Sequence, residues 1–186
     1  MVNAMPAHLQ EPRLEILFDA RKIQSRVREL AVQVSEDYRG RTPHLVGILK
    51  GAWVFMADLI RHLSIEVTVD FLGIQSYGAS TESYGEVKIT KDLDVSIVGR
   101  DVLVVEDILD TGRTFHYLQE ILLAHGPASL KLVTLLDKAS RRMLPVRADY
   151  VGFEIPNVFV VGYGLDFAQK YRWLSDVRFL PNVPSV

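Results

Sequence analysis

The sequence predicts an α/β fold: one domain built on a mainly parallel, twisted sheet that is flanked by helices. Short apolar runs typical of buried strands alternate along the chain with stretches that carry apolar residues at helical spacing. Such alternation produces parallel sheets with helices on both faces. At 186 residues, with 48% hydrophobic and 24% charged residues, the chain has the size and composition of a single globular domain.

The first elements follow in order from the N-terminus. Residues 14–18 predict a short strand, and Asp19 can cap the helix that comes next. The apolar face of this helix repeats at helical spacing through Ile23, Val27, Leu30 and Val34. Residues 45–49 form an apolar run typical of a buried parallel strand, and residues 52–63 again show helical spacing. This part of the chain therefore predicts strand, helix, strand and helix.

A hairpin is expected next. The β-branched and aromatic residues 67–74 predict one strand, and residues 87–90 predict the returning arm. The segment Ser76–Glu86 contains glycines, serines and two tyrosines but no aliphatic anchor. Because such a segment buries little surface, we expect a mobile loop between the two strands.

The remaining core elements continue the alternation. A strand is expected over residues 102–105, a helix over residues 114–125 and a strand over residues 130–136. Together with the earlier elements they define a core over about residues 19–144. We expect their strands to lie parallel in one sheet, because each connection between them contains a helix.

The composition changes from Pro145 onward. Short strands are expected over residues 149–155 and 159–163, and they alternate with proline, asparagine and glycine. We expect residues 145–186, joined by residues 12–18, to form a small irregular lobe over the carboxyl edge of the sheet.

Charge and composition argue against several classes of protein. The net charge of −2 provides no bulk attraction to nucleic acid, and no cysteine is available for disulfides, nucleophilic catalysis or zinc binding. The first ten residues lack the apolar core of a signal peptide, and no apolar run approaches the roughly 20 residues of a membrane span. We expect a cytoplasmic protein without nucleic-acid or membrane partners, whose residues 1–11 form a frayed arm.

The most informative segment is Val102–Thr114. It runs from a buried strand through the adjacent carboxylates Glu106 and Asp107 into a short polar loop and then into a helix. Small and hydroxyl residues at a helix start favour anion binding, because the first backbone N–H groups are unpaired and the helix dipole attracts negative charge. Carboxylates beside such a loop suit a sugar phosphate with ribose hydroxyls or bound magnesium nearby. The sequence contains neither a Walker loop nor a dinucleotide fingerprint.

This segment resembles the phosphoribosyl pyrophosphate (PRPP) signature of the type I phosphoribosyltransferases. Further motifs are similar to the purine-salvage branch of that family, the hypoxanthine-guanine phosphoribosyltransferases, and the resemblance extends from about Leu14 to Leu180. It implies the type I phosphoribosyltransferase fold, in which the small lobe is called the hood and holds the base. It also implies an enzyme that uses Mg²⁺ and transfers 5-phosphoribosyl from PRPP to N9 of hypoxanthine or guanine. The products would be IMP or GMP and pyrophosphate.

The resemblance assigns one continuous loop to the 5′-phosphate of PRPP: Asp110, Thr111, Gly112, Arg113 and Thr114. The family often has lysine where this sequence has Arg113, and the positive charge is kept. Asp110 is also the residue expected near purine N7, where it would accept or share a proton as the base attacks C1′. Carboxylate neighbours and desolvation would raise its proton affinity. The alternative is that Asp110 only caps the helix.

Glu106 and Asp107 are expected to bind the ribose hydroxyls or to order magnesium through water. Adjacent residues on a strand point to opposite faces, so they would not form a bidentate pair unless the strand has already ended. The alternative is a pair of solvated carboxylates at a strand end. The resemblance also implies that Asp166 helps to hold a second magnesium.

The triplet Leu49-Lys50-Gly51 matches the pyrophosphate loop of the family, and Arg172 is expected to reach the same group. Gly51 at a strand-to-helix junction frees backbone N–H groups for an anion, and Lys50 adds positive charge. The family often has the Leu–Lys peptide in the cis form. The alternative for Arg172 and Asp166 is that either forms half of a surface ion pair.

Ser76 and Tyr77 open the expected mobile segment and match the catalytic flap of the family. A flap that excludes water suits a transition state that resembles a ribosyl oxocarbenium ion, because water would otherwise capture that ion. The alternative is an ordinary hairpin tip.

Lys138 fits the family position that contacts O6 of a 6-oxopurine. A lysine can donate to a carbonyl oxygen but not to an amino group, which would select hypoxanthine or guanine over adenine. Phe159 is expected to stack on the base, the Val160 backbone to read its edge, and Leu165 to line the pocket. The alternative for this stretch is an ordinary buried strand.

Two other functions remain open. A regulator that senses PRPP on the same fold and binds nucleic acid would need a basic face or an added domain. A phosphoribosyltransferase that prefers xanthine would use the same Lys138, because xanthine also carries O6. Members of the family form dimers and tetramers, so a homodimer or homotetramer is expected. The helix over residues 52–63, with Trp53 on its outer side, is a candidate interface.

Overall fold

The computed structural model of the protein describes residues 13–76 and 87–181. The expected arm over residues 1–11 lies outside the described residues, as do Tyr77 and the rest of the expected loop up to Glu86. The strands are β1 (Glu15–Phe18), β2 (His44–Leu49), β3 (Thr68–Ser76), β4 (Val87–Lys91), β5 (Asp101–Leu109), β6 (Ser129–Asp137), β7 (Tyr150–Glu154), β8 (Phe159–Val161) and β9 (Val177–Leu180). The helices are α1 (Ala20–Asp37), α2 (Trp53–His62), α3 (Arg113–Ala124) and the 3-10 helix η2 (Ala139–Arg141).

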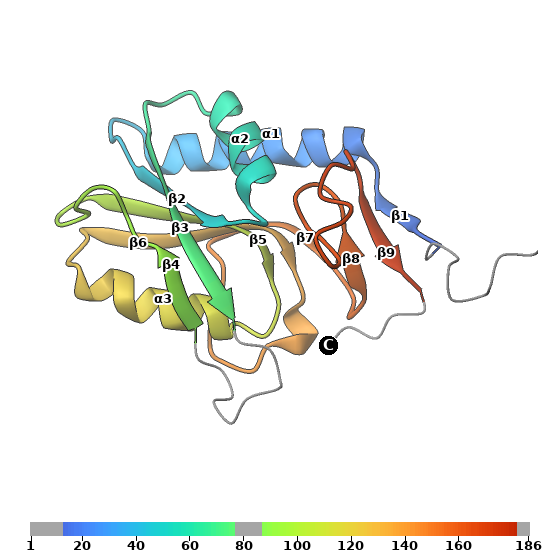
Figure 1. Cartoon of the computed structure of the whole chain (residues 1–186). Helices are drawn as coiled ribbons and strands as arrows, with labels where there is room; N and C mark the ends of the chain where they lie inside the picture. The colour runs from blue at the N-terminus through green and yellow to red at the C-terminus, as the bar shows by residue number, and fades with distance from the viewer. Residues whose placement is uncertain (1–12, 77–86, 182–186) are drawn as a thin grey trace, which may run out of the picture.

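The core is a six-stranded sheet in the order β4-β3-β2-β5-β6-β7. Neighbouring strands from β3 to β7 run parallel, and β4 pairs with β3 in the antiparallel direction as the returning arm of the expected hairpin. Helices α1 and α2 cover one face of the sheet and α3 covers the other (Figure 1). The predicted α/β class with a mainly parallel sheet is confirmed.

Each helix packs because of one apolar stripe. The side chain of Asp19 accepts a hydrogen bond from the Lys22 amide (2.8 Å) and so caps α1, as the sequence predicts. The buried residues of α1 include the predicted face: Ile23, Val27, Leu30 and Val34. Burying one such side chain contributes about 1.5–3 kcal/mol. Phe115, Leu118 and Leu122 of α3 pack on the opposite face of the sheet, with Val102 and Val104 of β5.

The parallel strands bring three loops to one edge of the sheet. The chain leaves the carboxyl ends of β2, β5 and β6 at Leu49, Leu109 and Asp137. Each end is followed directly by residues expected to bind substrate, because open α/β sheets bind ligands at this edge. The fold therefore brings together residues that are about 90 positions apart in the sequence.

A second sheet of three strands, in the order β1-β9-β8, lies beside the carboxyl edge (Figure 1). All its pairs are antiparallel, and the N-terminal strand joins the C-terminal ones as expected for the hood. The expectation that residues 149–155 form a hood strand is wrong: β7 is the edge strand of the large sheet and pairs in parallel with β6. None of the helices in the described part of the chain is long and apolar enough to cross a membrane.

Candidate active site

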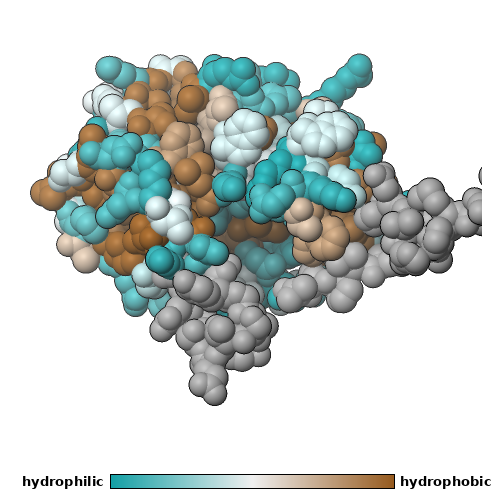
Figure 2. All heavy atoms as spheres, viewed as in Figure 1, coloured by the Kyte–Doolittle hydropathy of each residue, from teal (hydrophilic) through white to brown (hydrophobic). Residues whose placement is uncertain are grey.

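Two adjoining cavities open at the carboxyl edge of the large sheet, where the space-filling view shows a hollow between the core and the hood (Figure 2). The first, here called the Phe159 cavity, has a volume of about 200 Å³. It is lined by Asp107, Asp110, Lys138, Phe159, Val160, Leu165 and Asp166, among others. The second, here called the Lys50 cavity, has a volume of about 690 Å³, and its lining includes Lys50, Gly51, Lys91, Asp107, Thr114, Asp166 and Arg172. Asp107 and Asp166 line both cavities.

The loop after β2 forms one wall of the Lys50 cavity. The peptide bond between Leu49 and Lys50 is cis. A Cβ atom on Gly51 would lie 1.6 Å from Oδ2 of Asp107, and a Cβ on Gly164 would lie 2.2 Å from the Gly51 carbonyl oxygen. Glycine is therefore required at both positions, because any side chain would displace the neighbouring segment.

The polar loop after β5 leads into α3 through Gly112, which has φ of +84° and stands at the N-cap. No side chain caps the helix there, so the alternative that Asp110 is a helix cap is wrong. Arg142 donates to the carbonyl oxygens of Leu109 (3.0 Å) and Asp110, and the Met143 amide donates to that of Thr111 (3.0 Å). The first amides of a helix have no acceptor within it, and the Arg113 amide makes only a long contact with Oγ1 of Thr111 (3.4 Å), so the start of α3 can bind an anion.

Asp110 lies between two cations. Its Oδ2 is 3.2 Å from Nζ of Lys138 and its Oδ1 is 3.1 Å from Nε of Arg141. The sequence predicted carboxylate neighbours for Asp110, whereas the ion pairs of its side chain are with these two cations. The two cations come from the turn after β6, which lies beside β5 in the sheet but 28 or more positions later in the chain. A carboxylate between two cations is held in a defined orientation by charge-assisted hydrogen bonds.

Glu106 and Asp107 occupy opposite faces, because β5 continues to Leu109. Glu106 is buried, with 9% of its surface exposed, and its Oε2 has no hydrogen-bond partner in the described residues. Burial raises the pKa of Glu106 well above its usual value, and the neighbouring Asp107 charge raises it further. The alternative of two solvated carboxylates is therefore wrong.

Asp107 is the member of this pair that faces the cavities. Burial raises the pKa of Asp107 to about 6. The amide of Ile108, which donates to Oδ1 of Asp107 (2.8 Å), and the charge of Arg172 oppose this rise, while Asp166 adds to it. Asp107 and Asp166 thus form an acidic pair that a cation would stabilise.

Asp166 and Arg172 pair with each other. Nη2 of Arg172 lies 2.6 Å from Oδ1 of Asp166, and the Gln169 amide donates to Oδ2 of Asp166 (2.8 Å). Nη1 of Arg172 donates to the Gly164 carbonyl oxygen (2.6 Å). Both side chains are largely buried and both line the Lys50 cavity, so the pair belongs to the cavity wall and not to the outer surface.

The four residues expected to hold a purine all line the Phe159 cavity. Lys138 is buried, with 4% of its surface exposed, and its Nζ is directed at Asp110. The Phe159 ring meets the Phe167 ring edge to face, with centroids 5.4 Å apart and planes at 78°. Val160 and Leu165 are buried beside it. The cavity thus combines apolar walls with one cation and the carboxylates of Asp107, Asp110 and Asp166, an arrangement suited to a flat heterocycle that carries a carbonyl oxygen and N–H groups.

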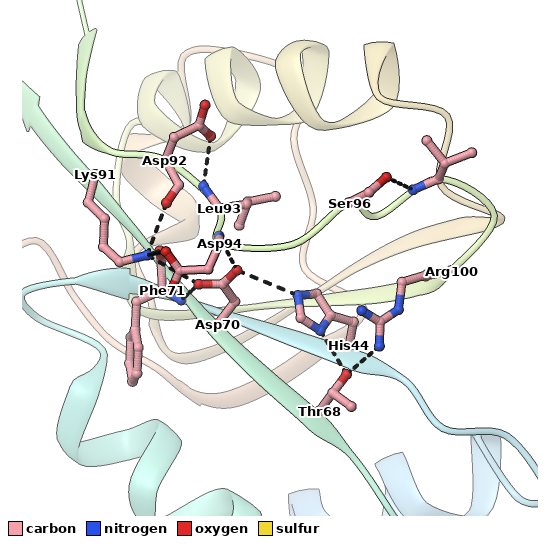
Figure 3. Close-up of polar contacts among 11 residues, drawn as sticks. His44, Thr68, Asp70, Phe71, Lys91, Asp92, Leu93, Asp94, Ser96 and Arg100 are labelled. Carbon is pink, nitrogen blue, oxygen red and sulfur yellow. Dashed lines mark hydrogen bonds and ion pairs between the residues drawn. The ribbon is translucent and has the colours of Figure 1, made fainter.

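Some lining residues were not predicted from the sequence, and Lys91 at the end of β4 is the most informative of them. Its Nζ donates to Oδ1 of the buried Asp70 (3.2 Å), to Oδ1 of Asp94 (3.1 Å) and to the Phe71 carbonyl oxygen (2.9 Å), as Figure 3 shows. No local motif marks Lys91, because its partner Asp70 lies 21 positions earlier on β3. Ser76 is the last residue of β3, beside the lining residue Gln75.

Comparison with known proteins agrees with this geometry. Residues 14–168 match the model of the phosphoribosyl transferase domain family. The chain is 50% identical over 166 residues to the hypoxanthine-guanine phosphoribosyltransferase of Bacillus subtilis (strain 168), and this match covers 89% of this chain and 92% of that protein. It is 49% identical over 166 residues to the bifunctional protein TilS/HprT of Listeria monocytogenes serotype 4b, a match that covers 89% of this chain and 26% of that protein. A solved structure of a hypoxanthine-guanine phosphoribosyltransferase from Bacillus anthracis has a TM-score of 0.86 and 47% identity, and covers 91% of this chain and 99% of that one.

Proposed function

This chain belongs to the phosphoribosyltransferase family, among its hypoxanthine-guanine members, and we propose that it transfers 5-phosphoribosyl from PRPP to N9 of hypoxanthine or guanine. One observation carries the choice of base: the buried Lys138 lies beside the apolar side chains of Phe159, Val160 and Leu165, in a cavity that shares Asp107 and Asp166 with a larger cavity. A purine in the first cavity and a diphosphate in the second would lie on the two sides of a ribose. The products are IMP or GMP and pyrophosphate.

The 5′-phosphate is held by the loop and the start of α3. The helix N-terminus supplies free amides, Thr111 and Thr114 supply hydroxyls, and Arg113 supplies charge. Gly112 in its left-handed conformation lets the backbone approach the phosphate closely. Because these donors sit on a sheet end and a helix, they stay in place as the sugar reacts.

Asp110 manages the proton on purine N7. Support comes from its place in the wall of the Phe159 cavity, beside Lys138. As N9 attacks C1′, positive charge grows on the purine, and a carboxylate beside N7 accepts or shares the proton that becomes acidic. Lys138 donates to O6 of the base, and Phe159, Val160 and Leu165 enclose the ring. Adenine has an amino group at this position, which would face the buried ammonium donor to donor and offer Lys138 no acceptor on the base.

The leaving diphosphate is bound by Lys50, the amides around Gly51, and Arg172. Support comes from the lining of the Lys50 cavity, in which these cations face the shared carboxylates. Arg172 would exchange its contact with Asp166 for the diphosphate, because a guanidinium binds phosphate oxygens in a bidentate manner.

The carboxylates of this site fit magnesium. In the described residues no group of three or more His, Asp or Glu side chains is arranged to hold a metal alone. Magnesium does not need such a group, since it binds through one or two carboxylates together with waters and substrate phosphates. Asp107 would serve one ion and Asp166 a second, because both line the two cavities, whereas Glu106 lies on the opposite face of β5 and would not bind the same ion directly. When bound, Mg²⁺ neutralises charge on the leaving diphosphate.

A homodimer or homotetramer is proposed on the family resemblance. Trp53 at the start of α2 is 49% exposed, which suits a contact between copies. Light scattering coupled to size-exclusion chromatography measures the mass of the assembly in solution.

The test of the function is a turnover panel of hypoxanthine, guanine, xanthine and adenine with PRPP and Mg²⁺. We expect rapid formation of IMP or GMP and at least about a hundredfold lower kcat/KM with adenine. Faster turnover of xanthine than of the other bases would replace the proposal with a xanthine enzyme. Absence of turnover together with salt-dependent binding of RNA or DNA would replace it with a PRPP-sensing regulator.

A further inference from the structure

A buried hydrogen bond joins the hood to the helical layer of the core. The hydroxyl of Tyr163 donates to Oδ2 of Asp58 on α2 at 2.6 Å. The same carboxylate accepts hydrogen bonds from the side chains of Gln24 on α1 and Arg61 on α2. Tyr163 is 3% exposed and Asp58 is 8% exposed. Burial alone would raise the pKa of Asp58, but the hydrogen bonds from Tyr163, Gln24 and Arg61 outweigh it and keep that pKa below its usual value.

Tyr163 lies in an unusual turn. Three successive residues, Gly162, Tyr163 and Gly164, have φ values of +95°, +51° and +101°. The left-handed conformation is unfavourable for tyrosine and persists only where the surroundings impose it. The backbone hydrogen bonds of these three residues lead to Leu165, Arg172 and Leu174, which belong to the same lobe. Those bonds shape the turn, whereas the Tyr163 hydroxyl ties it to the core.

This turn leads directly into two residues of the cavity walls. Gly164 packs against the carbonyl oxygen of Gly51, so closely that a Cβ on it would come within 2.2 Å. The next two residues, Leu165 and Asp166, line the Phe159 cavity, and Asp166 also lines the Lys50 cavity. A shift of the turn would therefore move Asp166 and its partner Arg172 relative to the Lys50–Gly51 loop.

We propose that the Tyr163–Asp58 hydrogen bond is a positioning contact that sets the distance between the hood and the Lys50–Gly51 loop and so determines the affinity for PRPP. This inference rests on the proposed function, in which Lys50, Gly51 and Arg172 bind the diphosphate of PRPP. Asp110 follows the end of β5, and its side chain accepts from Lys138 and Arg141, which come from the turn after β6. Loss of the bond therefore weakens substrate binding and leaves the chemical step largely unchanged.

The chain contains a matched control. The hydroxyl of Tyr150 on β7 donates to Oδ2 of Asp37 on α1, also at 2.6 Å, and Tyr150 is 6% exposed. Neither residue lines a cavity of the site. Tyr163→Phe and Tyr150→Phe thus each remove one hydroxyl from a buried tyrosine that donates to an aspartate, and only the Tyr163 turn packs against the Gly51 carbonyl oxygen. The two pairs differ in that Asp58 is buried, whereas 49% of the Asp37 side chain is exposed.

The experiment measures PRPP binding by calorimetric titration, together with KM and kcat and the thermal unfolding midpoint. For Tyr163→Phe we expect Kd and KM for PRPP to rise about fivefold or more, with kcat within about twofold of wild type. For Tyr150→Phe we expect a lower unfolding midpoint but a PRPP Kd within about twofold of wild type. A wild-type PRPP Kd in folded Tyr163→Phe, or an equal rise in Tyr150→Phe, overturns the inference.

A second variant keeps the test decisive if Tyr163→Phe folds poorly. Asp58→Asn should raise the PRPP Kd in the same way, because the amide is a weaker acceptor and presents hydrogens to its three donors. If the bond is the cause, the double variant binds PRPP no more weakly than the weaker single variant, whereas additive effects overturn the inference. Failure here is distinct from failure of the proposed function, since wild-type protein that converts hypoxanthine or guanine establishes the function whatever the variants do.

Discussion

Nζ of Lys138 lies 3.2 Å from Oδ2 of Asp110, so the cation assigned to the purine oxygen and the carboxylate assigned to the purine proton are already in contact. Both side chains come from the carboxyl ends of neighbouring parallel strands, β5 and β6. The pair thus sits where a base entering the Phe159 cavity would meet both groups at once.

Asp110→Asn should lower kcat at least about a hundredfold, because the amide cannot accept the purine proton. The PRPP Kd should change by less than about threefold, since the 5′-phosphate is held mainly by the loop amides and hydroxyls. Steady-state kinetics and a PRPP titration measure the two effects separately. Retention of wild-type turnover would remove Asp110 from the proton transfer.

Lys138→Gln should lower kcat/KM for hypoxanthine about a hundredfold and reduce the preference over adenine, because the donor to O6 loses its charge. KM for PRPP should stay within about twofold. Lys131→Gln is the control, since Lys131 lies on the same strand but pairs with Asp37 away from the site. The same loss in both variants would mean that the strand, and not the purine contact, is responsible.

Asp107→Asn should raise stability at neutral pH while it weakens binding of PRPP with Mg²⁺. The folded-state pKa of about 6 exceeds the unfolded value near 4, so the folded protein binds the proton more tightly than the unfolded chain does. The resulting penalty is absent below about pH 4, grows to about pH 6 and stays constant above it. In thermal melts without ligand, the variant should therefore melt roughly 5 °C higher at pH 8 and no higher at pH 4. A lower melting point at pH 8 would contradict the raised pKa.

Asp70→Asn should destabilise the protein by about 2–4 kcal/mol at pH 7. The Asp70 carboxylate accepts hydrogen bonds from the backbone amides of Phe71 and Asp94 (both 2.6 Å) and from the Lys91 side chain (Figure 3). The NH₂ group of an asparagine side chain would face at least one of these N–H donors, so that hydrogen bond would be lost. Burial alone would raise the pKa of Asp70, but these hydrogen bonds lower it below its usual value. Its contribution is therefore complete above about pH 4 and is lost as the pH falls through the folded-state pKa.

The control for this measurement is Asp92→Asn. Asp92 follows β4 directly, and among the described residues its side chain accepts a hydrogen bond from the Leu93 amide alone (2.8 Å). We expect its effect on the free energy of unfolding, measured with urea, to stay within about 0.5 kcal/mol. Equal effects of the two substitutions would show that Asp70 is no more important than a surface carboxylate.

The sequence predicted the elements and loops that depend on local patterns. Apolar spacing identified α1, and the aspartate before it identified its cap at Asp19. The glycines between strand and helix patterns identified the junctions at Gly51 and Gly112. These predictions succeed because capping, periodicity and glycine conformations are properties of adjacent residues. The family resemblance then named residues that the structure gathers around two adjoining cavities.

Features that depend on distant pairs could not be predicted. Strand β7 reads locally like the hood strands that follow it, and only its pairing with β6 assigns it to the core. The cations beside Asp110 and the partner of Lys91 likewise come from strands that meet in space alone. Side-chain networks of this kind leave no periodic pattern in the sequence, because their members are far apart in the chain and meet only in the folded structure.

Asp107 and Asp166 stand in the wall between the two cavities, and this shared boundary has a thermodynamic consequence. A ligand in the Phe159 cavity changes the electrostatic field at a ligand in the Lys50 cavity, and the reverse also holds. The affinities for the two ligands are therefore linked, and each ligand changes the affinity for the other by the same factor. Titrating either ligand in the presence of the other would measure that interaction energy directly. An inhibitor that occupies both cavities would bind more tightly than either part alone, because a single molecule loses its translational freedom only once.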